Sequence, residues 1–171
     1  MEKLYWDTIK INDKKLYFTV NSNGLNFISD ADQGISQIYQ FYPKGQFEFR
    51  NQRKVTAEYV DQFEDFLLGE IKQFDLPIDI QEAGDAKLQR VWQLIQTIPY
   101  GSIMSVAELA QKAGVDEATV KHALKESPLM MIIPVHRIIC EEKLDNVVRG
   151  GLAMKSQLLE MEAINGLDDI E

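Results

Sequence analysis

The chain has little of the residue types that form disulfide bonds or hold metals. Cys140 is its one cysteine, and it contains two histidines. A single cysteine excludes a disulfide within the chain, and one cysteine with two histidines cannot form an ordinary structural zinc site without several carboxylates. We therefore expect neither a metal nor another cofactor.

Long hydrophobic runs are also missing. No stretch approaches the roughly 20 apolar residues of a membrane-spanning helix. The N-terminal residues MEKLYWD lack the charged-then-apolar order of a signal peptide. We therefore predict a cytoplasmic protein without membrane contacts, and we take it to be a monomer.

Positive charge is in deficit. The 171 residues include 18 Lys and Arg against 27 Asp and Glu, a net charge of −9 spread over both halves. Proteins that hold duplex DNA rely largely on Lys and Arg that displace counterions from phosphates. The balance therefore disfavours tight DNA binding, although it allows a local basic patch.

The N-terminal residues have the pattern of an antiparallel meander. Leu16, Phe18 and Val20 alternate with other side chains, and an apolar run resumes after Asn23-Gly24. Asn and Gly accept the positive φ that a type I′ turn needs, so the pattern predicts a hairpin with that turn. We interpret residues 3–30 as a small antiparallel sheet.

Two later segments have the apolar spacing of amphipathic helices, one between Thr56 and Glu70 and one from Leu88 to Ile95. Between them, residues 75–86 contain a proline, a glycine and several acidic side chains without periodicity. We place a domain boundary there, which predicts an N-terminal domain over residues 1–80 and a C-terminal domain over 81–171.

Residues 105–124 are typical of a helix-turn-helix. Ser105 with Glu108 is a capping-box pattern, Gly114 is placed to end that helix, and Asp116 can cap the next one. This arrangement is common in DNA-binding proteins. Because helical hairpins that bind nothing share it, the pattern alone leaves DNA binding open.

The segment from Ser127 to Cys140 is the densest in potential chemistry. It could be a buried apolar strand or turn in which His136 and Arg137 make internal hydrogen bonds. However, its residues Pro-Val-His-Arg-Ile-Ile at 134–139 resemble a known active-site box. That box is Pro-Cys-His-Arg-Val-Ile of the O6-alkylguanine-DNA alkyltransferases, or methylated-DNA–protein-cysteine methyltransferases. Val135 stands where the acceptor cysteine belongs.

The resemblance covers about residues 75–165. Further short matches occur in the family's order and close to its spacing: Val91-Trp92, Ile98-Pro99-Tyr100-Gly101, Glu108-Leu109-Ala110, Ala123-Leu124, Ser127-Pro128, Gly150-Gly151-Leu152, Lys155, Leu158-Leu159 and Glu162. The resemblance implies an α+β fold, with a small ribonuclease-H-like β-sheet domain before a mainly helical helix-turn-helix (winged-helix-like) domain.

The family's reaction is one irreversible transfer. A cysteine thiolate, activated through a water by a histidine and a glutamate, takes the alkyl group from a guanine flipped out of the duplex. By resemblance, His136 is the proton acceptor, Glu162 is its orienting partner and Arg137 completes the box. Since Val135 has no nucleophile, we expect no catalytic residue in this degenerate site.

Other functional positions have also become aliphatic. The resemblance places Val106 where a tyrosine presses on a phosphate, and Ala118 where an arginine enters the base stack. Val148 replaces a tyrosine near the double glycine. The pattern indicates that the ancestral reaction is lost and the fold retained. Cys140, five residues beyond Val135, is interpreted as a small buried hydrophobe, and His136 as a structural hydrogen-bonding residue.

The expected DNA contacts lie mainly on the second helix of the helix-turn-helix. They are Val106, Ala118, Thr119, Lys121, His122, Lys125 and Ser127. Three acidic residues of the same segment, Asp116, Glu117 and Glu126, offset its positive charges. A solvated face of mixed charge is therefore the competing interpretation.

Three functional hypotheses follow. The chain is a non-enzymatic, alkyltransferase-like protein that binds duplex DNA with an alkylated guanine and recruits a repair partner. Alternatively, the fold is reused as a protein-interaction or regulatory module without DNA binding, with a small-ligand pocket lined by Val135, Val148 and Met131. In the third hypothesis, Cys140 replaces the lost nucleophile. We choose the first, because the shape of the module is suited to a DNA groove.

Overall fold

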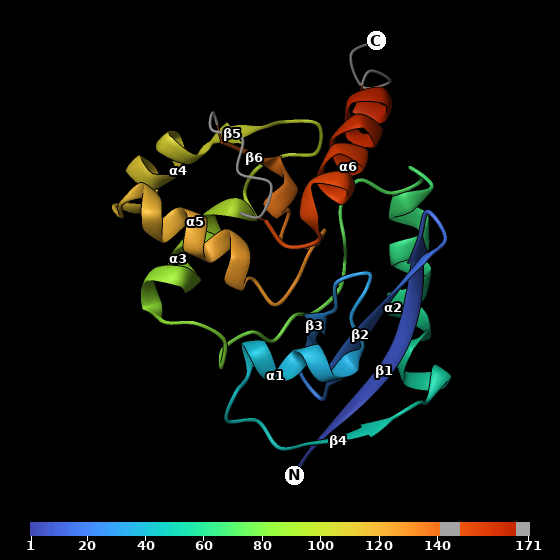
Figure 1. The fold of residues 1–171 in the computed structure, drawn as a ribbon. Helices are drawn as coiled ribbons and strands as arrows, with labels where there is room; N and C mark the ends of the chain where they lie inside the picture. Colours follow the sequence, from blue (N-terminus) through green and yellow to red (C-terminus); the bar gives the residue numbers. More distant parts are fainter. Residues whose placement is uncertain (141–147, 167–171) are drawn as a thin grey trace. The chain divides into compact units, whose positions relative to one another are not determined.

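The computed structural model describes residues 1–140 and 148–166. The chain divides into two compact units, Met1–Ala83 and Gly84–Glu171. The first unit is built on a β-sheet and the second consists mainly of helices (Figure 1). The predicted α+β class, with an N-terminal sheet and a helical C-terminal part, is therefore confirmed.

The predicted meander is confirmed in the first unit. Strands β1 (Glu2–Ile11), β2 (Lys14–Asn21) and β3 (Gly24–Ile28) pair antiparallel in succession. A short strand, β4 (Phe47–Arg50), then pairs parallel to β1, which gives the order β3-β2-β1-β4. Strand β4 was not predicted, because four residues give too short a pattern to recognise.

The type I′ turn predicted at Asn23-Gly24 is wrong. Consecutive positive φ angles occur one turn earlier, at Asn12 (49°) and Asp13 (66°). At the later turn the Asn21 Oδ1 accepts hydrogen bonds from the amides of Asn23, at 2.8 Å, and Gly24, at 3.0 Å. A side chain therefore closes that turn. Gly24 serves a close approach instead, since a Cβ there would lie 2.4 Å from the Pro77 carbonyl oxygen.

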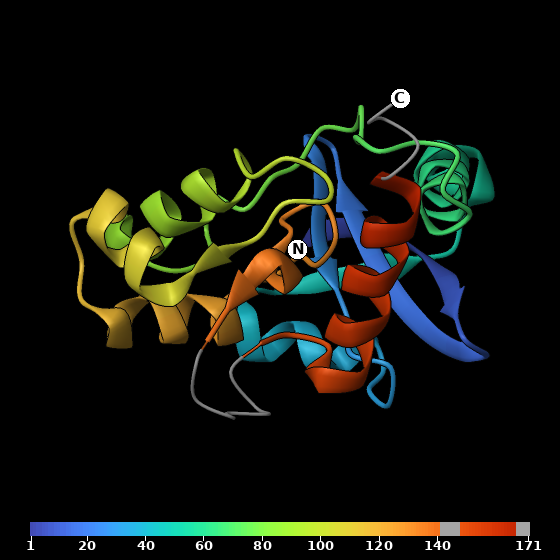
Figure 2. The same ribbon diagram turned by 90° about the horizontal axis from the view of Figure 1, so that it is seen from above.

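Helices lie on both sides of this sheet (Figures 1 and 2). On one face lies α2 (Arg53–Leu67), which confirms the predicted helix, although it begins and ends three residues earlier. Its buried Phe63 ring lies 5.5 Å from that of Phe18. On the other face, α1 (Ile38–Phe41) follows the 3-10 turn η1 (Ile35–Gln37).

The second unit contains the predicted helix-turn-helix. Its elements in chain order are α3 (Ala86–Ile95), β5 (Met104–Ser105), α4 (Val106–Ala113), α5 (Glu117–Glu126), η2 (Val135–Arg137), β6 (Ile138–Ile139) and α6 (Gly151–Gly166). Trp92 on α3 is fully buried, and its indole N–H donates to the Ala123 carbonyl at 2.9 Å. This bond fixes α3 against α5.

The helix ends follow the predicted caps, but the capping box at Ser105 is only half formed, because the Glu108 carboxylate pairs with Lys112 instead of the Ser105 amide. The Ser105 hydroxyl accepts from the Glu108 amide at 3.0 Å, and Gly114 ends α4 with a φ of 70°. The Asp116 carboxylate accepts from the Thr119 amide at 2.8 Å and so caps α5. Among the described residues, no helix combines the length and apolar character needed to cross a membrane.

Candidate functional site

Two tight turns shape the approach to the family-like box. The Ile132 amide donates to the Met130 carbonyl, and the Val135 amide to the Ile133 carbonyl, both at 2.7 Å. Between the first pair, Met131 has a φ of 67°, a region that non-glycine residues rarely occupy. The backbone before Val135 is therefore closely constrained, and Val135 itself is 2% exposed.

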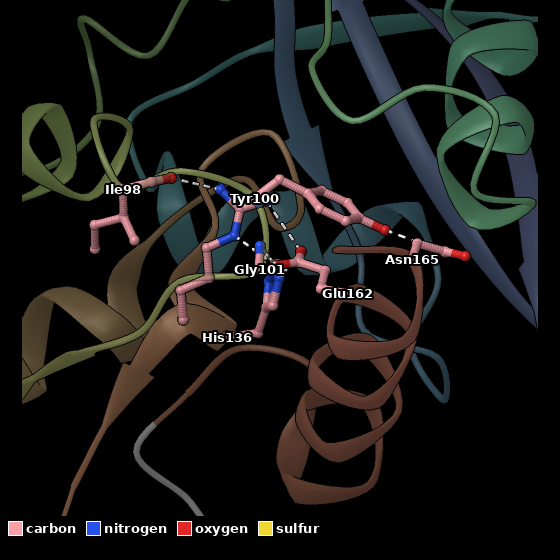
Figure 3. Close-up of polar contacts among 7 residues, drawn as sticks. Ile98, Tyr100, Gly101, His136, Glu162 and Asn165 are labelled. Carbon is pink, nitrogen blue, oxygen red and sulfur yellow. Dashed lines mark hydrogen bonds and ion pairs between the residues drawn. The ribbon is translucent and has the colours of Figure 1, made fainter. Parts of the chain in front are cut away.

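Glu162 on α6 is the centre of a buried polar network (Figure 3). Its carboxylate accepts from the Arg137 Nε at 2.8 Å and Nη2 at 3.0 Å, and from the Gly101 amide at 3.1 Å. The His136 Nε2 lies 2.5 Å from its Oε2. The three side chains are all buried, so this is a desolvated ion pair with a histidine attached.

Arg137 connects this network to the Pro-Tyr-Gly turn. Its Nη1 donates to the Ile98 carbonyl at 2.6 Å, and its guanidinium lies 5.6 Å from the centre of the Tyr100 ring. The Tyr100 hydroxyl accepts from the Asn165 amide nitrogen at 3.3 Å (Figure 3). The structure thus brings His136 into contact with Glu162, as the family resemblance implied, and Arg137 binds the same carboxylate.

The network sets the charge states. Burial alone would raise the pKa of Glu162, but hydrogen bonds from His136 and Arg137, together with the positive charges that both carry in acid, outweigh it and lower that pKa to about 2. Burial lowers the pKa of His136, and this outweighs the opposing effect of Glu162. A neutral His136 that donates from Nε2 to the carboxylate leaves Nδ1 as an unprotonated acceptor.

The Nδ1 atom of His136 is buried and, within the described residues, has no hydrogen-bond partner. Since unpaired buried polar atoms are costly, it is the kind of group that accepts a proton or a hydrogen bond during function. The next residue towards the N-terminus is Val135, whose isopropyl group offers no proton. The site therefore retains a proton acceptor without a nucleophile beside it.

Cys140 lies just beyond β6 and is half-buried. Lys155 on α6 donates to the Ile138 carbonyl at 2.6 Å. No hydrogen bond joins Cys140 to His136 or Glu162 in the part of the chain that the structure describes. The network that activates a proton acceptor therefore does not include this thiol.

The predicted DNA contacts fall into two groups. Ala118, His122 and Lys125 are exposed on α5, and Thr119 and Lys121 are partly exposed. Two others need correction: Val106 is 3% exposed and Ser127 is fully buried, so their side chains do not face solvent. Val106 begins α4 with its side chain in the core, and the Ser127 hydroxyl donates to the Leu129 carbonyl at 2.7 Å.

The sequence analysis missed Gly101 and Arg149. The Gly101 amide donates to Glu162, and the sequence does not reveal this contact because the two residues are far apart along the chain. The buried Arg149 donates from Nη1 to the Ser127 carbonyl, and its amide donates to the Leu124 carbonyl. It closes the end of α5, and no local pattern marks a buried arginine.

No group of three or more His, Cys, Asp or Glu in residues 1–140 and 148–166 is arranged to hold a metal ion. The absence of a metal and of other cofactors stays a prediction.

Comparison with known proteins identifies the scaffold. A family model described as the DNA binding domain of 6-O-methylguanine DNA methyltransferase matches residues 87–164. The chain is 27% identical to the inducible methylated-DNA–protein-cysteine methyltransferase of Bacillus subtilis, over 93% of this chain and 90% of that protein. It is 32% identical to the Mycobacterium leprae methylated-DNA–protein-cysteine methyltransferase, over 75% of this chain and 78% of that protein.

Solved structures agree with the sequence comparison. The O6-methylguanine methyltransferase of Mycobacterium tuberculosis has a TM-score of 0.77 at 27% identity, over 96% of this chain and 94% of that chain. The Mycobacterium tuberculosis OGT in complex with DNA has a TM-score of 0.76 at 25% identity, over 94% of both chains. The similarity therefore extends through both units, beyond the box and its flanking motifs.

Proposed function

Because this chain belongs to the methylated-DNA–protein-cysteine methyltransferase family, we propose that it is a member that binds DNA without transferring alkyl groups. It would act as a sensor of alkylation damage linked to DNA repair. Its ligand would be duplex DNA with an alkylated guanine, and it would then recruit a protein partner. We place this monomeric protein in the cytoplasm.

The observation that carries the proposal is the valine before His136. Alkyl transfer needs a nucleophile that attacks the alkyl carbon while the guanine oxygen leaves. The isopropyl group of Val135 has no lone pair for that attack. The network of His136, Arg137 and Glu162 around it is complete, so the loss concerns the reaction and leaves the architecture of the site in place.

DNA is the proposed ligand because the helix-turn-helix is formed and its second helix is accessible. The exposed residues Ala118, His122 and Lys125 and the partly exposed Thr119 and Lys121 would face the groove. A structural neighbour from Mycobacterium tuberculosis was solved in complex with DNA, which supports DNA as the ligand.

One observation favours the second function, a protein-interaction module without DNA binding. The first turn of α5 presents exposed Asp116 and Glu117, at the helix end that approaches DNA in helix-turn-helix proteins. Their charges repel phosphates and oppose the contribution of Lys121 and Lys125. A measurement of the affinity for duplex DNA therefore distinguishes the DNA-binding function from the protein-interaction module.

The absence of alkyl transfer is tested by incubating the protein with an excess of duplex containing O6-methylguanine and measuring its intact mass. The proposal expects an unchanged protein mass and unaltered lesion. A protein that gains one methyl group would overturn it. Peptide mapping would then show whether Cys140 is the acceptor, and the Cys140→Ser variant would confirm that assignment by losing the transfer.

A further inference from the structure

The charges of the first unit are segregated along the chain. Of the nine Lys and Arg in residues 1–83, eight lie in residues 1–21 and 44–54, together with four Asp and Glu. The remaining residues of this unit carry ten Asp and Glu and a single lysine, Lys72. The positive charge of this acidic unit is thus concentrated on strands β1, β2 and β4, on Lys44 just before β4, and on the first turn of α2.

Strand pairing places part of this charge on one sheet face. In the β1–β2 register, Lys10 is opposite Lys15, Thr8 opposite Tyr17 and Trp6 opposite Thr19. Since side chains alternate between faces, these residues share the face opposite to the one that α2 covers. Thr19 on this face is buried, and α1 lies on the same side of the sheet (Figures 1 and 2). The five residues of the face that are not buried are Trp6, Thr8, Lys10, Lys15 and Tyr17, and we call them the open sheet face.

The two lysines destabilise the folded sheet. Like charges directly opposite each other across an antiparallel pair are destabilising. Lys10 and Lys15 are both exposed, and within the described residues neither amine forms an ion pair with a carboxylate. The arrangement is explained if an anion neutralises them.

Aromatic rings adjoin the lysines. The Trp6 and Tyr17 rings lie 5.8 Å apart, and the Lys15 amine lies 5.8 Å from the centre of the Tyr17 ring. Both rings are partly exposed. On β4, Phe49 is the register partner of Leu4 and so shares this face, where its ring lies 6.4 Å from that of Tyr39, which is 40% exposed.

We propose that the open sheet face binds single-stranded DNA. Partly exposed aromatic rings on a sheet surface stack unpaired bases, and adjacent lysines hold the phosphates between them. Duplex bases are not available for such stacking, so the chemistry selects a single strand. Bases would stack on Trp6 and Tyr17, and phosphates would contact Lys10 and Lys15.

This site is independent of the lesion-binding role proposed for α5. It uses residues of the first unit alone, whereas α5 and the network around Glu162 belong to the second. Either binding activity can therefore fail while the other is retained, and separate probes distinguish them: a labelled single-stranded oligonucleotide for the sheet, and a blunt duplex for α5.

Tryptophan fluorescence gives a direct readout, because the chain has two tryptophans and Trp92 is fully buried. Titration of the full-length protein with oligo(dT) of about 20 nucleotides should quench emission, since a base stacked on an indole quenches it. The Trp6→Phe variant should show no quenching while it still binds the fluorescein-labelled oligonucleotide by anisotropy.

Charge and stacking variants locate the site. Lys10→Glu with Lys15→Glu should weaken oligo(dT) binding by at least about tenfold and reduce the salt slope by roughly 1.4, the value for two phosphate contacts on a single strand. Tyr17→Ala should weaken it by at least about fivefold, the lower limit for one stacked base. Lys72→Glu, a matched charge reversal outside the face, should leave the affinity unchanged.

Several results would overturn the proposal. One is the absence of oligo(dT) binding at low salt. Another is oligo(dT) binding that persists in the double variant Lys10→Glu with Lys15→Glu but is lost in the double variant Lys121→Glu with Lys125→Glu. Tighter binding of an oligo(rU) of the same length would contradict the assignment to DNA. Dimerisation that Trp6→Ala abolishes, without any oligonucleotide binding, would show that a second copy occupies this face.

Discussion

Single residues decide what the family-like site can do. Val135 removes the nucleophile, while the buried Nδ1 of His136 keeps an acceptor lone pair and Glu162 holds the other ring nitrogen. Each role belongs to a different side chain, although His136 and Arg137 both depend on the Glu162 carboxylate. The site is therefore open to tests by single substitutions.

Restoring the cysteine tests how much the other replacements matter. We expect Val135→Cys alone to fail to restore efficient repair, because Ala118 and Val106 leave extrusion of the base unsupported. Extrusion costs a few kcal/mol, which corresponds to roughly a hundredfold in rate. Single-turnover transfer of a labelled methyl group from a lesion duplex measures it, with an active relative as reference. Near-normal transfer by this variant would show that the tyrosine and arginine are dispensable.

Removing the charge of Glu162 should destabilise the second unit strongly. Glu162→Gln leaves the buried guanidinium of Arg137 without its carboxylate, a change that typically costs about 3–5 kcal/mol. Urea unfolding followed by Trp92 emission in a Trp6→Phe background reports it. Glu160→Gln, on the exposed side of the same helix, is the matched control and should change the free energy of unfolding by less than about 0.5 kcal/mol. Equal effects of the two variants would contradict the structural role of the network.

The same network predicts a loss of stability in acid. The pKa of Glu162 is about 2 instead of 4.5, so the unfolded chain takes up this proton first and stability falls as the pH drops from about 4.5 towards 2. The pKa of His136 is lowered from 6.5, so its contribution has the same sign and begins to be lost below about pH 6.5. Urea midpoints measured over this range should decline. His136→Gln should remove the decline just below pH 6.5, and a midpoint that rises on acidification would refute the assignment.

At the scale of helices and strands, local signals were the reliable ones. Ser105 and Asp116 were predicted as caps and are caps, because capping depends on a few neighbouring residues. The bond from Trp92 to Ala123 and the buried position of Ser127 depend on packing between distant segments, which spacing does not reveal. The misplaced type I′ turn has the same origin, since Gly24 is required by contact with Pro77.

The first turn of α5 carries the charge that opposes DNA binding. Asp116→Asn should preserve the cap, since Asn caps helices as well as Asp does, and should raise the affinity for duplex DNA about two- to fivefold. Asp61→Asn changes the net charge equally on α2 and should leave the affinity unchanged. Anisotropy at low salt compares them. If Asp116→Asn has no effect on affinity while the duplex still binds, α5 is not the helix that faces the DNA.

Across the whole molecule, a family scaffold carries a strongly negative net charge. The similarity to a Mycobacterium tuberculosis methyltransferase, with a TM-score of 0.77, includes residues of both units, yet the net charge of this chain is −9. The domain boundary between residues 80 and 81 stays a prediction. The division into compact units falls between Ala83 and Gly84 along the chain. The balance between shape and charge therefore decides whether the protein acts on DNA at all.

The most direct test is fluorescence anisotropy of a labelled blunt duplex that carries one O6-methylguanine, titrated beside the unmodified duplex at low and moderate salt. A blunt duplex offers no single strand to the open sheet face, so the signal reports the second unit. The account predicts tighter binding to the lesion, with an affinity that falls as salt rises. No binding of either duplex at low salt would contradict it and leave the protein-interaction module as the function of this fold.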